Sequence, residues 1–277
     1  GNMLGYYALL HVLIGAFGSG AFVIRLPSAL AAAATVAIVD VLALRLFDRR
    51  TALMAGLLAS LSLSLVYWGQ DARGYALMVA LIAGSFLAFL ALLEERAGWP
   101  AWFAYALLTT AAVYAGLEAV LVVPAQLVML LWYRDRVRPV LSAVAVAAIC
   151  CVPLAVLAAN RGSGQLFWVP PPSLRIAKQV IQALTSSALQ PSFYTSTGTA
   201  LVVLTALVLG AGAWWTWRLV HASGVRAACG PALMVSWVLV PVVLALIESA
   251  VGQSIFQPRY ILLSLIHISE PTRQAEI

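Results

Sequence analysis

Charged side chains are scarce in this chain. Asp, Glu, Lys and Arg make up 9% of its residues, whereas 63% of them are hydrophobic. This balance excludes an ordinary soluble domain, in which about a quarter of the residues are charged. Apolar runs long enough to cross a bilayer recur along the whole sequence. We therefore predict an all-α fold, a polytopic bundle of transmembrane helices.

Cysteines in a metal-binding or disulfide pattern are also lacking. Neither the adjacent pair Cys150 and Cys151 nor the distant Cys229 has the spacing of a zinc site or a favourable disulfide. We interpret all three as small apolar side chains. The glycine-rich stretch from Gly15 to Gly20 lacks the strand that precedes a nucleotide-binding fingerprint, so a soluble nucleotide-sugar donor is not predicted.

Hydropathy predicts about eight complete spans and a truncated ninth that begins near Tyr260. The eight lie at residues 24–46, 51–68, 74–93, 99–114, 117–133, 139–159, 198–218 and 231–249. The apolar run from Leu4 to Phe17 is too short to span, and we expect a juxtamembrane or re-entrant helix there. One long connection, residues 160–198, contains Pro170, Pro171 and Pro172 and then an amphipathic segment.

Both ends of the sequence have features of an incomplete open reading frame. The chain begins at Gly1 without an initiator methionine or a signal sequence, which leads us to expect a truncation. Residues 263–277 resemble translated sequencing-library adapter, and we exclude them, with His267, from any site. The predicted organisation is one transmembrane domain over residues 1–262, incomplete at both ends, and an adapter-derived tail over 263–277.

Basic residues predict the orientation in the membrane. If the spans alternate in direction, nine of the sixteen Lys and Arg fall on one face, which we assign to the cytoplasm. These nine are Arg45, Arg49, Arg50, Arg96, Arg134, Arg136, Arg138, Arg218 and Arg226. Because basic residues sit in short loops between spans, the net charge of +6 does not indicate nucleic-acid binding.

A polar junction, residues 67–75, separates two of the apolar runs and contains Gln70, Asp71 and Arg73. Ionisable groups beside membrane segments are costly unless they pair or function, so they are functional candidates. Other polar and aromatic residues are expected on the same, extracytoplasmic face: Asn2, Tyr6, Tyr7, His11, Arg25, Tyr114, Glu118, Arg259 and Tyr260. We hypothesise that they form a site for an anionic lipid headgroup. The alternative is that each arginine extends to the interface or pairs with a neighbouring acid.

The segment from Gln70 to Leu77 resembles the QEARxYAL signature of bacterial membrane glycosyltransferases of the GT-C type, with Asp71 in place of Glu. That superfamily includes protein mannosyltransferases and lipid A aminoarabinose transferases. Five further segments are similar to the family in the right order, so that the resemblance extends over residues 1 to about 262. They are Gly1–His11, Phe22–Leu30 (ALRLPSAL in the family), Arg45–Arg50 (RLFGRR), Phe167–Leu174 (a tryptophan followed by PPPS) and Gln257–Tyr260 (PRY).

Two departures from the family pattern limit what is carried over. Family members have a Y-(A/T)-H-Y-F turn where this chain has the segment from Tyr114 to Glu118, so the role of that histidine is either absent or has passed to Glu118. In these enzymes the catalytic aspartate lies in the first outer loop, which would precede Asn2. We therefore expect the catalytic residue outside the given sequence, and an inactive fragment.

The resemblance implies inverting transfer of a sugar, mannose-like or another hexose or pentose, from a polyprenyl-phosphate donor. The acceptor would be a lipid, glycan or protein at the extracytoplasmic face of the bacterial inner membrane. This chemistry needs a carboxylate base, cations that hold the phosphate, and a groove for the lipid chain. We predict no metal-binding residues in the sequence and no particular cofactor. The involvement of a divalent metal ion is left open. The predicted substrate-binding residues are Arg259 and Arg25 at the phosphate, Asp71 and Arg73 as a pair that shapes the site, and Tyr260, Tyr75, Gln70, Glu118, Tyr6, Tyr7 and Asn2.

Two other functions stay open. A transporter or lipid flippase would show inverted repeats and ionisable groups near the middle of the membrane. The sequence shows no such repeat, and its ionisable residues are predicted at one face. The other alternative is a catalytically silent membrane scaffold.

Overall fold

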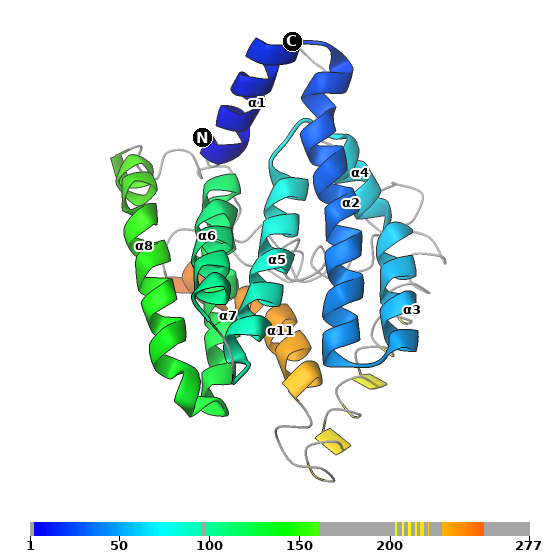
Figure 1. Cartoon of the computed structure of the whole chain (residues 1–277), viewed down its shortest axis with the longest axis vertical. Coiled ribbons are helices and arrows are strands. Elements are labelled where there is room, and N and C mark those ends of the chain that lie inside the picture. The colour runs from blue at the N-terminus through cyan, green and yellow to red at the C-terminus, as the bar shows by residue number, and fades with distance from the viewer. Residues whose placement is uncertain are drawn as a thin grey trace.

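The computed structural model describes residues 3–95, 98–160 and 229–251, with scattered positions between 203 and 221. Within these residues every regular element is a helix (Figure 1). The elements are α1 (Leu4–Phe17), α2 (Ala21–Leu46), α3 (Arg49–Ser60), α4 (Leu63–Gln70), α5 (Tyr75–Leu93), α6 (Trp99–Ala115), the 3-10 helices η1 (Leu117–Val122), η2 (Val128–Leu131) and η3 (Arg134–Arg136), α7 (Val123–Leu127), α8 (Val137–Asn160) and α11 (Cys229–Val251). The described part of the chain confirms the predicted all-α class.

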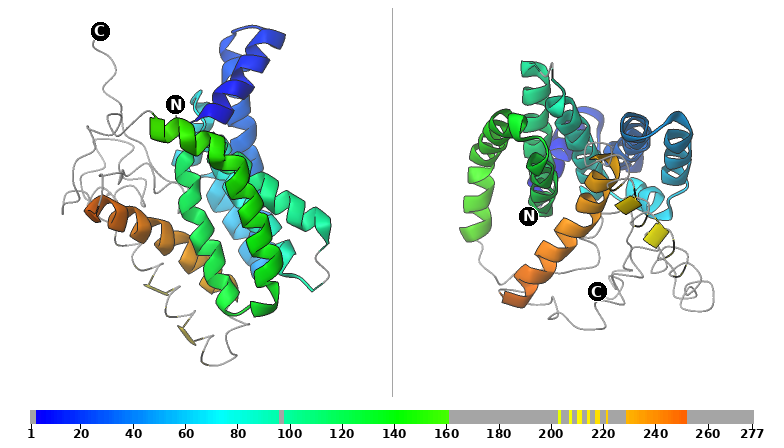
Figure 2. Two further views of the ribbon diagram at one scale, coloured as in Figure 1. Left: turned by 90° about the vertical axis from the view of Figure 1, so that its left-hand side faces the viewer. Right: turned by 90° about the horizontal axis from the view of Figure 1, so that it is seen from below.

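Helix α5 forms the centre of the bundle. It packs between α2 and α6, and most of its side chains are buried (Figure 1). Phe86 stacks on Trp237 of α11 with ring centroids 3.9 Å apart, and Phe89 contacts the ring of Tyr105 on α6. Figure 2 shows α11 crossing the bundle obliquely, where it packs on η1, α7 and η2. Among the four long apolar helices that the structure describes, α5 is the most deeply buried.

Peripheral helices present large apolar side chains outward, as expected for contact with lipid. Exposed examples are Leu53, Met54, Leu57 and Leu58 on α3 and Ile149, Val152 and Val156 on α8. Four described helices are long and apolar enough to cross a membrane: Ala21–Leu46, Tyr75–Leu93, Arg134–Asn160 and Cys229–Glu248. The chain is thus a multi-pass membrane protein.

These four helices match the predicted spans 24–46, 74–93, 139–159 and 231–249. The short helix Leu4–Phe17 also forms as predicted. A total of about eight spans stays a prediction. Residues 161–200 and 252–277 lie outside the described residues, and so does most of the predicted span 198–218. The long connection, the ninth span and the tail at 263–277 fall within them.

The predicted span 51–68 is interrupted. Helix α3 ends at Ser60, and α4 begins at Leu63 after a break at Leu61 and Ser62. The Ser62 side chain accepts a hydrogen bond from the backbone N–H of Leu65 at 3.4 Å, and thus caps α4. Serine favours such a helix start because its hydroxyl satisfies a backbone donor that the helix leaves unpaired. Hydropathy registers the apolar residues on both sides of the break but not the cap.

The predicted span 117–133 is not a regular α-helix. Residues 117–131 form η1, α7 and η2, in which ten of the fifteen residues have 3-10 conformation. A 3-10 helix rises about 2.0 Å per residue against about 1.5 Å for an α-helix, so this segment reaches about 28 Å rather than about 22 Å. The tighter winding brings a short segment close to the thickness of the hydrocarbon core, about 30 Å.

The described helices run alternately up and down, which gives the bundle two different ends (Figures 1 and 2). The α2–α3 turn, the α5–α6 connection and the start of α8 lie at one end, where Arg45 pairs with Glu94 at 3.4 Å. Arg49, Arg50, Arg134, Arg136 and Arg138 belong to the same end. Helix α1, the start of α2 and the polar junction lie at the opposite end (Figure 1). This separation agrees with the alternation on which the predicted orientation depends.

Candidate functional site

The polar junction is fixed to α1 and α2 by a chain of hydrogen bonds. Tyr6 on α1 is fully buried, and its hydroxyl lies 2.9 Å from the hydroxyl of Ser28 on α2. Ser28, also fully buried, donates to the backbone carbonyl of Arg73 at 3.2 Å. Three segments that are distant in sequence therefore meet through two hydroxyl groups. Such bonds carry weight because a buried hydroxyl without a partner is costly.

Two glycines allow the backbones at this end to approach closely. A Cβ added at Gly74 would lie 2.8 Å from the carbonyl oxygen of Ala115 and 3.1 Å from the Cβ of Tyr6. A Cβ at Gly116 would collide with the sulfur of Met78 and lie 3.0 Å from a carboxylate oxygen of Glu118. Helices α1, α5 and α6 and the start of η1 thus converge at one place.

The Asp71 and Arg73 side chains form an ion pair across the turn between α4 and α5. Nε of Arg73 lies 3.5 Å from a carboxylate oxygen of Asp71, and about a third of each side chain is exposed, 35% and 34%. This geometry agrees with the predicted pair. A role of the pair in shaping a substrate site stays a prediction.

Asp71 also influences the buried phenol beneath it. Burial raises the pKa of Tyr6 above its ordinary value, the hydrogen bond with Ser28 opposes the shift, and the negative charge of Asp71 adds to it. Tyr6 therefore stays protonated at neutral pH and can act as a hydrogen-bond donor.

Aromatic rings fix the remainder of the junction. Trp68 and Tyr75 are both buried, and their ring centroids lie 4.4 Å apart. Tyr67 meets Trp68 edge to face at 5.1 Å. The two rings on either side of the turn at residues 71–74 hold the end of α4 against the start of α5. The Asp71–Arg73 pair therefore lies in a turn that packed aromatic rings close at its base.

The other predicted site residues are only partly brought together. Tyr7 and Arg25 are exposed at the end that carries α1, and Gln70 is exposed as the last residue of α4. Glu118 lies in η1, and one of its carboxylate oxygens lies next to Gly116. The predicted residues Asn2, Arg259 and Tyr260 lie outside the described residues. Within the described part, no group of three or more His, Cys, Asp or Glu is placed to hold a metal ion.

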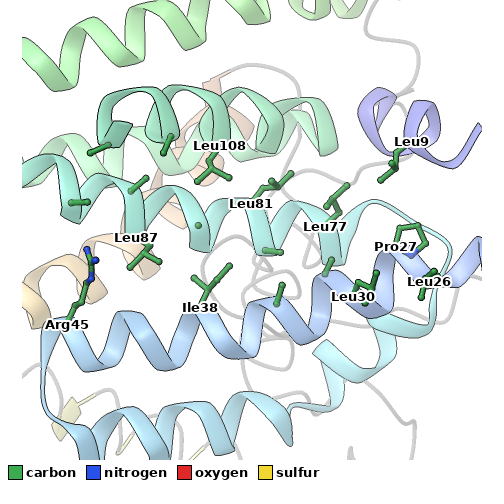
Figure 3. A pocket seen from close by; sticks show the side chains of 18 of the residues that line it. Leu9, Leu26, Pro27, Leu30, Ile38, Arg45, Leu77, Leu81, Leu87 and Leu108 are labelled. Atoms are coloured by element: carbon green, nitrogen blue, oxygen red, sulfur yellow. The ribbon is translucent and has the colours of Figure 1, made fainter. Parts of the chain in front are cut away.

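An apolar groove runs from this end along the bundle. It is a cavity of about 810 Å³ between α2 and α5, with walls completed by α1 and α6 (Figure 3). Leu9, Leu26 and Pro27 line the end next to Arg25 and Ser28. Its remaining lining is leucine, isoleucine, alanine and glycine, apart from Arg45 at the opposite end. We call this cavity the apolar groove.

Sequence reasoning missed Ser28, and it expected a groove for the lipid chain without identifying the residues that line it. Ser28 lies within the quoted LPSAL-like segment, and a hydroxyl directly after a proline in a span was a usable signal. It also missed a second buried network, in which Tyr105 donates to Gln126 at 2.8 Å and Gln126 donates to Ser85 at 3.0 Å. An amide within the apolar run 117–133 was the signal for that network.

Comparison with protein-family models gives a match over residues 3–159, more than half of the chain. The family is described as dolichyl-phosphate-mannose-protein mannosyltransferase. Comparison with curated proteins and with solved structures gives no significant match. The matched residues run from α1 to α8 and include the polar junction and every helix that lines the apolar groove. The chain belongs to the dolichyl-phosphate-mannose-protein mannosyltransferase family of membrane glycosyltransferases.

Proposed function

We propose that this glycosyltransferase domain takes its sugar from a polyprenyl-phosphate donor and acts at the extracytoplasmic face of a bacterial inner membrane. The observation that carries the proposal is the apolar groove, which begins beside Arg25 and the polar junction. A lipid chain could lie in the groove while its phosphate and sugar stay at the polar end. A water-soluble sugar donor has no lipid chain that could be buried in a groove of this composition.

The proposed reaction is a direct displacement with inversion. The bond between the anomeric carbon and the donor phosphate oxygen breaks, and a bond from that carbon to the acceptor hydroxyl oxygen forms. The acceptor proton passes to a carboxylate base. Arg25 and Arg259 are proposed to contact the phosphate as it gains negative charge. Tyr7 and Tyr260 are proposed to border the headgroup, with Gln70, Glu118 and Asn2 as further polar contacts, whereas the buried Tyr6 and Tyr75 are proposed to support the site without touching the headgroup.

Lipid binding by the chain itself tests the donor class without requiring turnover. In nanodiscs, we expect the chain to bind a polyprenyl phosphate at least about tenfold more tightly than the uncharged polyprenol, since charge-assisted contacts add about 1.5–3 kcal/mol. A nucleotide sugar should not compete. Equal affinity for the two lipids, or displacement of the phosphate lipid by a nucleotide sugar, would contradict a polyprenyl-phosphate donor.

Cysteine labelling tests the proposed orientation. In a variant in which Cys150, Cys151 and Cys229 are replaced by alanine, Gln70→Cys should react with an impermeant thiol reagent from the outside. Arg49→Cys should react only after the membrane is opened. Both side chains are exposed at opposite ends of the bundle. The preceding residue, Gly69, is a less suitable position for the labelled cysteine, because a Cβ added there would lie 2.9 Å from the Cβ of Ala32. Labelling of both positions from one side would refute the orientation.

A further inference from the structure

The hydrogen-bond chain beneath the polar junction has a defined direction. Ser28 donates its single hydroxyl proton to the carbonyl of Arg73, so it must accept in its bond with Tyr6. Tyr6 is then the donor in the 2.9 Å contact, and the carbonyl of Ile24, 3.5 Å from the same phenol oxygen, is a second and more distant acceptor for its proton. The relay runs from the Tyr6 phenol to the Ser28 hydroxyl and on to the Arg73 backbone.

The relay holds the main chain of Arg73 and leaves its side chain available. The contact with Asp71 is made at Nε, at one edge of the guanidinium, and 35% of the Arg73 side chain is exposed. A guanidinium carries five N–H donors in a planar fork, so the edge formed by its two Nη atoms can still engage another group. Phosphate is a favourable partner for that edge because it accepts two parallel hydrogen bonds.

Arg73 is also close in the chain to the entrance of the apolar groove. Leu77, two residues after Tyr75, lines the groove on α5. On the facing helix α2, Pro27 lines the groove and Ser28 follows it directly. Ser28 and Arg73 therefore belong to the two chain segments that form the polar end of the groove.

We propose that Tyr6 and Ser28 are positioning residues, which hold the Arg73 backbone so that the Arg73 guanidinium contacts the phosphate of the lipid donor. This inference rests on the proposed function and deepens it. It assigns a third arginine to the phosphate, beside Arg25 and Arg259. It also gives a role to two buried hydroxyl groups that would not touch the lipid.

The test measures binding of a polyprenyl phosphate and of the matching polyprenol to the chain in nanodiscs. Arg73→Ala, Ser28→Ala and Tyr6→Phe should each weaken binding of the phosphate lipid by about fivefold or more, since each loses or misplaces a charge-assisted contact. Binding of the polyprenol should not change. In the double variant, Ser28→Ala should add nothing to Arg73→Ala, because both act on one contact.

Matched controls come from the second buried network. Tyr105→Phe and Ser85→Ala remove a tyrosine donor and a serine that donates to a backbone carbonyl, away from the polar junction. They should leave the affinities for both lipids unchanged. Tyr6→Phe, which removes one oxygen atom, serves if Ser28→Ala does not fold.

Three outcomes would overturn the inference while the donor class stands: no effect of Tyr6→Phe, an equal loss for both lipids, or a Ser28→Ala effect that adds fully to that of Arg73→Ala. If the unmodified chain does not prefer the phosphate lipid, the proposed function itself fails, and the inference fails with it.

Discussion

Replacing Gly84 by phenylalanine is expected to weaken binding of a polyprenyl phosphate by about fivefold to 150-fold, because forcing extra volume into an occupied site costs about 1–3 kcal/mol. Gly84 lies on α5 and forms part of the wall of the apolar groove. A Cβ at this position would lie 3.5 Å from Leu108 and 4.0 Å from Ile38, which is ordinary contact. A larger side chain would continue into the groove, which Leu81 and Leu87 line on either side of this position in the sequence of α5 (Figure 3).

Two controls separate blocking of the groove from a general effect on the helix. Gly84→Ala should bind the lipid normally, because its added methyl group makes only ordinary contacts. It should also be slightly more stable, since alanine is the better helix former. Gly15→Phe introduces the same ring on α1, where a Cβ would meet nothing within 4 Å. Normal lipid binding by folded Gly84→Phe would show that the lipid chain lies elsewhere.

The sequence predicted the long helices well because one physical property determines them. A span of about twenty apolar residues forms a helix in lipid, where every backbone polar group must be satisfied within the segment. Helices α2, α5, α8 and α11 meet this condition without reference to their neighbours. Their boundaries in the structure differ from the predicted ones by only a few residues.

The interrupted segments were beyond the reach of hydropathy. The break at Ser62 depends on a single side-chain cap. The 3-10 winding of residues 117–131 accompanies tertiary contacts, since Gln126 bonds with Ser85 and the carbonyl of Ala125 accepts from Ser236 on α11. An average over a window of residues contains neither kind of information.

At the candidate site, sequence spacing was sufficient for the Asp71–Arg73 pair, whose members are two residues apart in one turn. It was insufficient for Ser28, whose partner is a backbone carbonyl 45 residues away in the sequence. The location of the apolar groove could not be predicted from the sequence either. Leucine and alanine from α1, α2, α5 and α6 line it, and the same residue types would fill an ordinary core.

Gly74→Val is expected to destabilise the chain by about 3 kcal/mol, near the upper end for overpacking of a tight site. The backbone at Gly74 has φ −67° and ψ −2°, which any residue can adopt, so the effect would be steric. The first obstacle is the carbonyl oxygen of Ala115, 2.8 Å from the added Cβ, and the second is the Cβ of Tyr6 at 3.1 Å. Neither atom is the end of a flexible side chain, so α1 and α6 would both have to move away from α5.

Thermal melting in one detergent would measure this loss, with Gly15→Val as the matched control. That substitution places the same branched side chain in α1 with no neighbour within 4 Å of its Cβ, and the melting temperature should change little. Because Tyr6 would move with α1, Gly74→Val should also lose the preference for a phosphate lipid over the polyprenol. An unchanged melting temperature would mean that α1 does not pack on the polar junction as described. The relay from Tyr6 to Arg73 would then lose its physical basis.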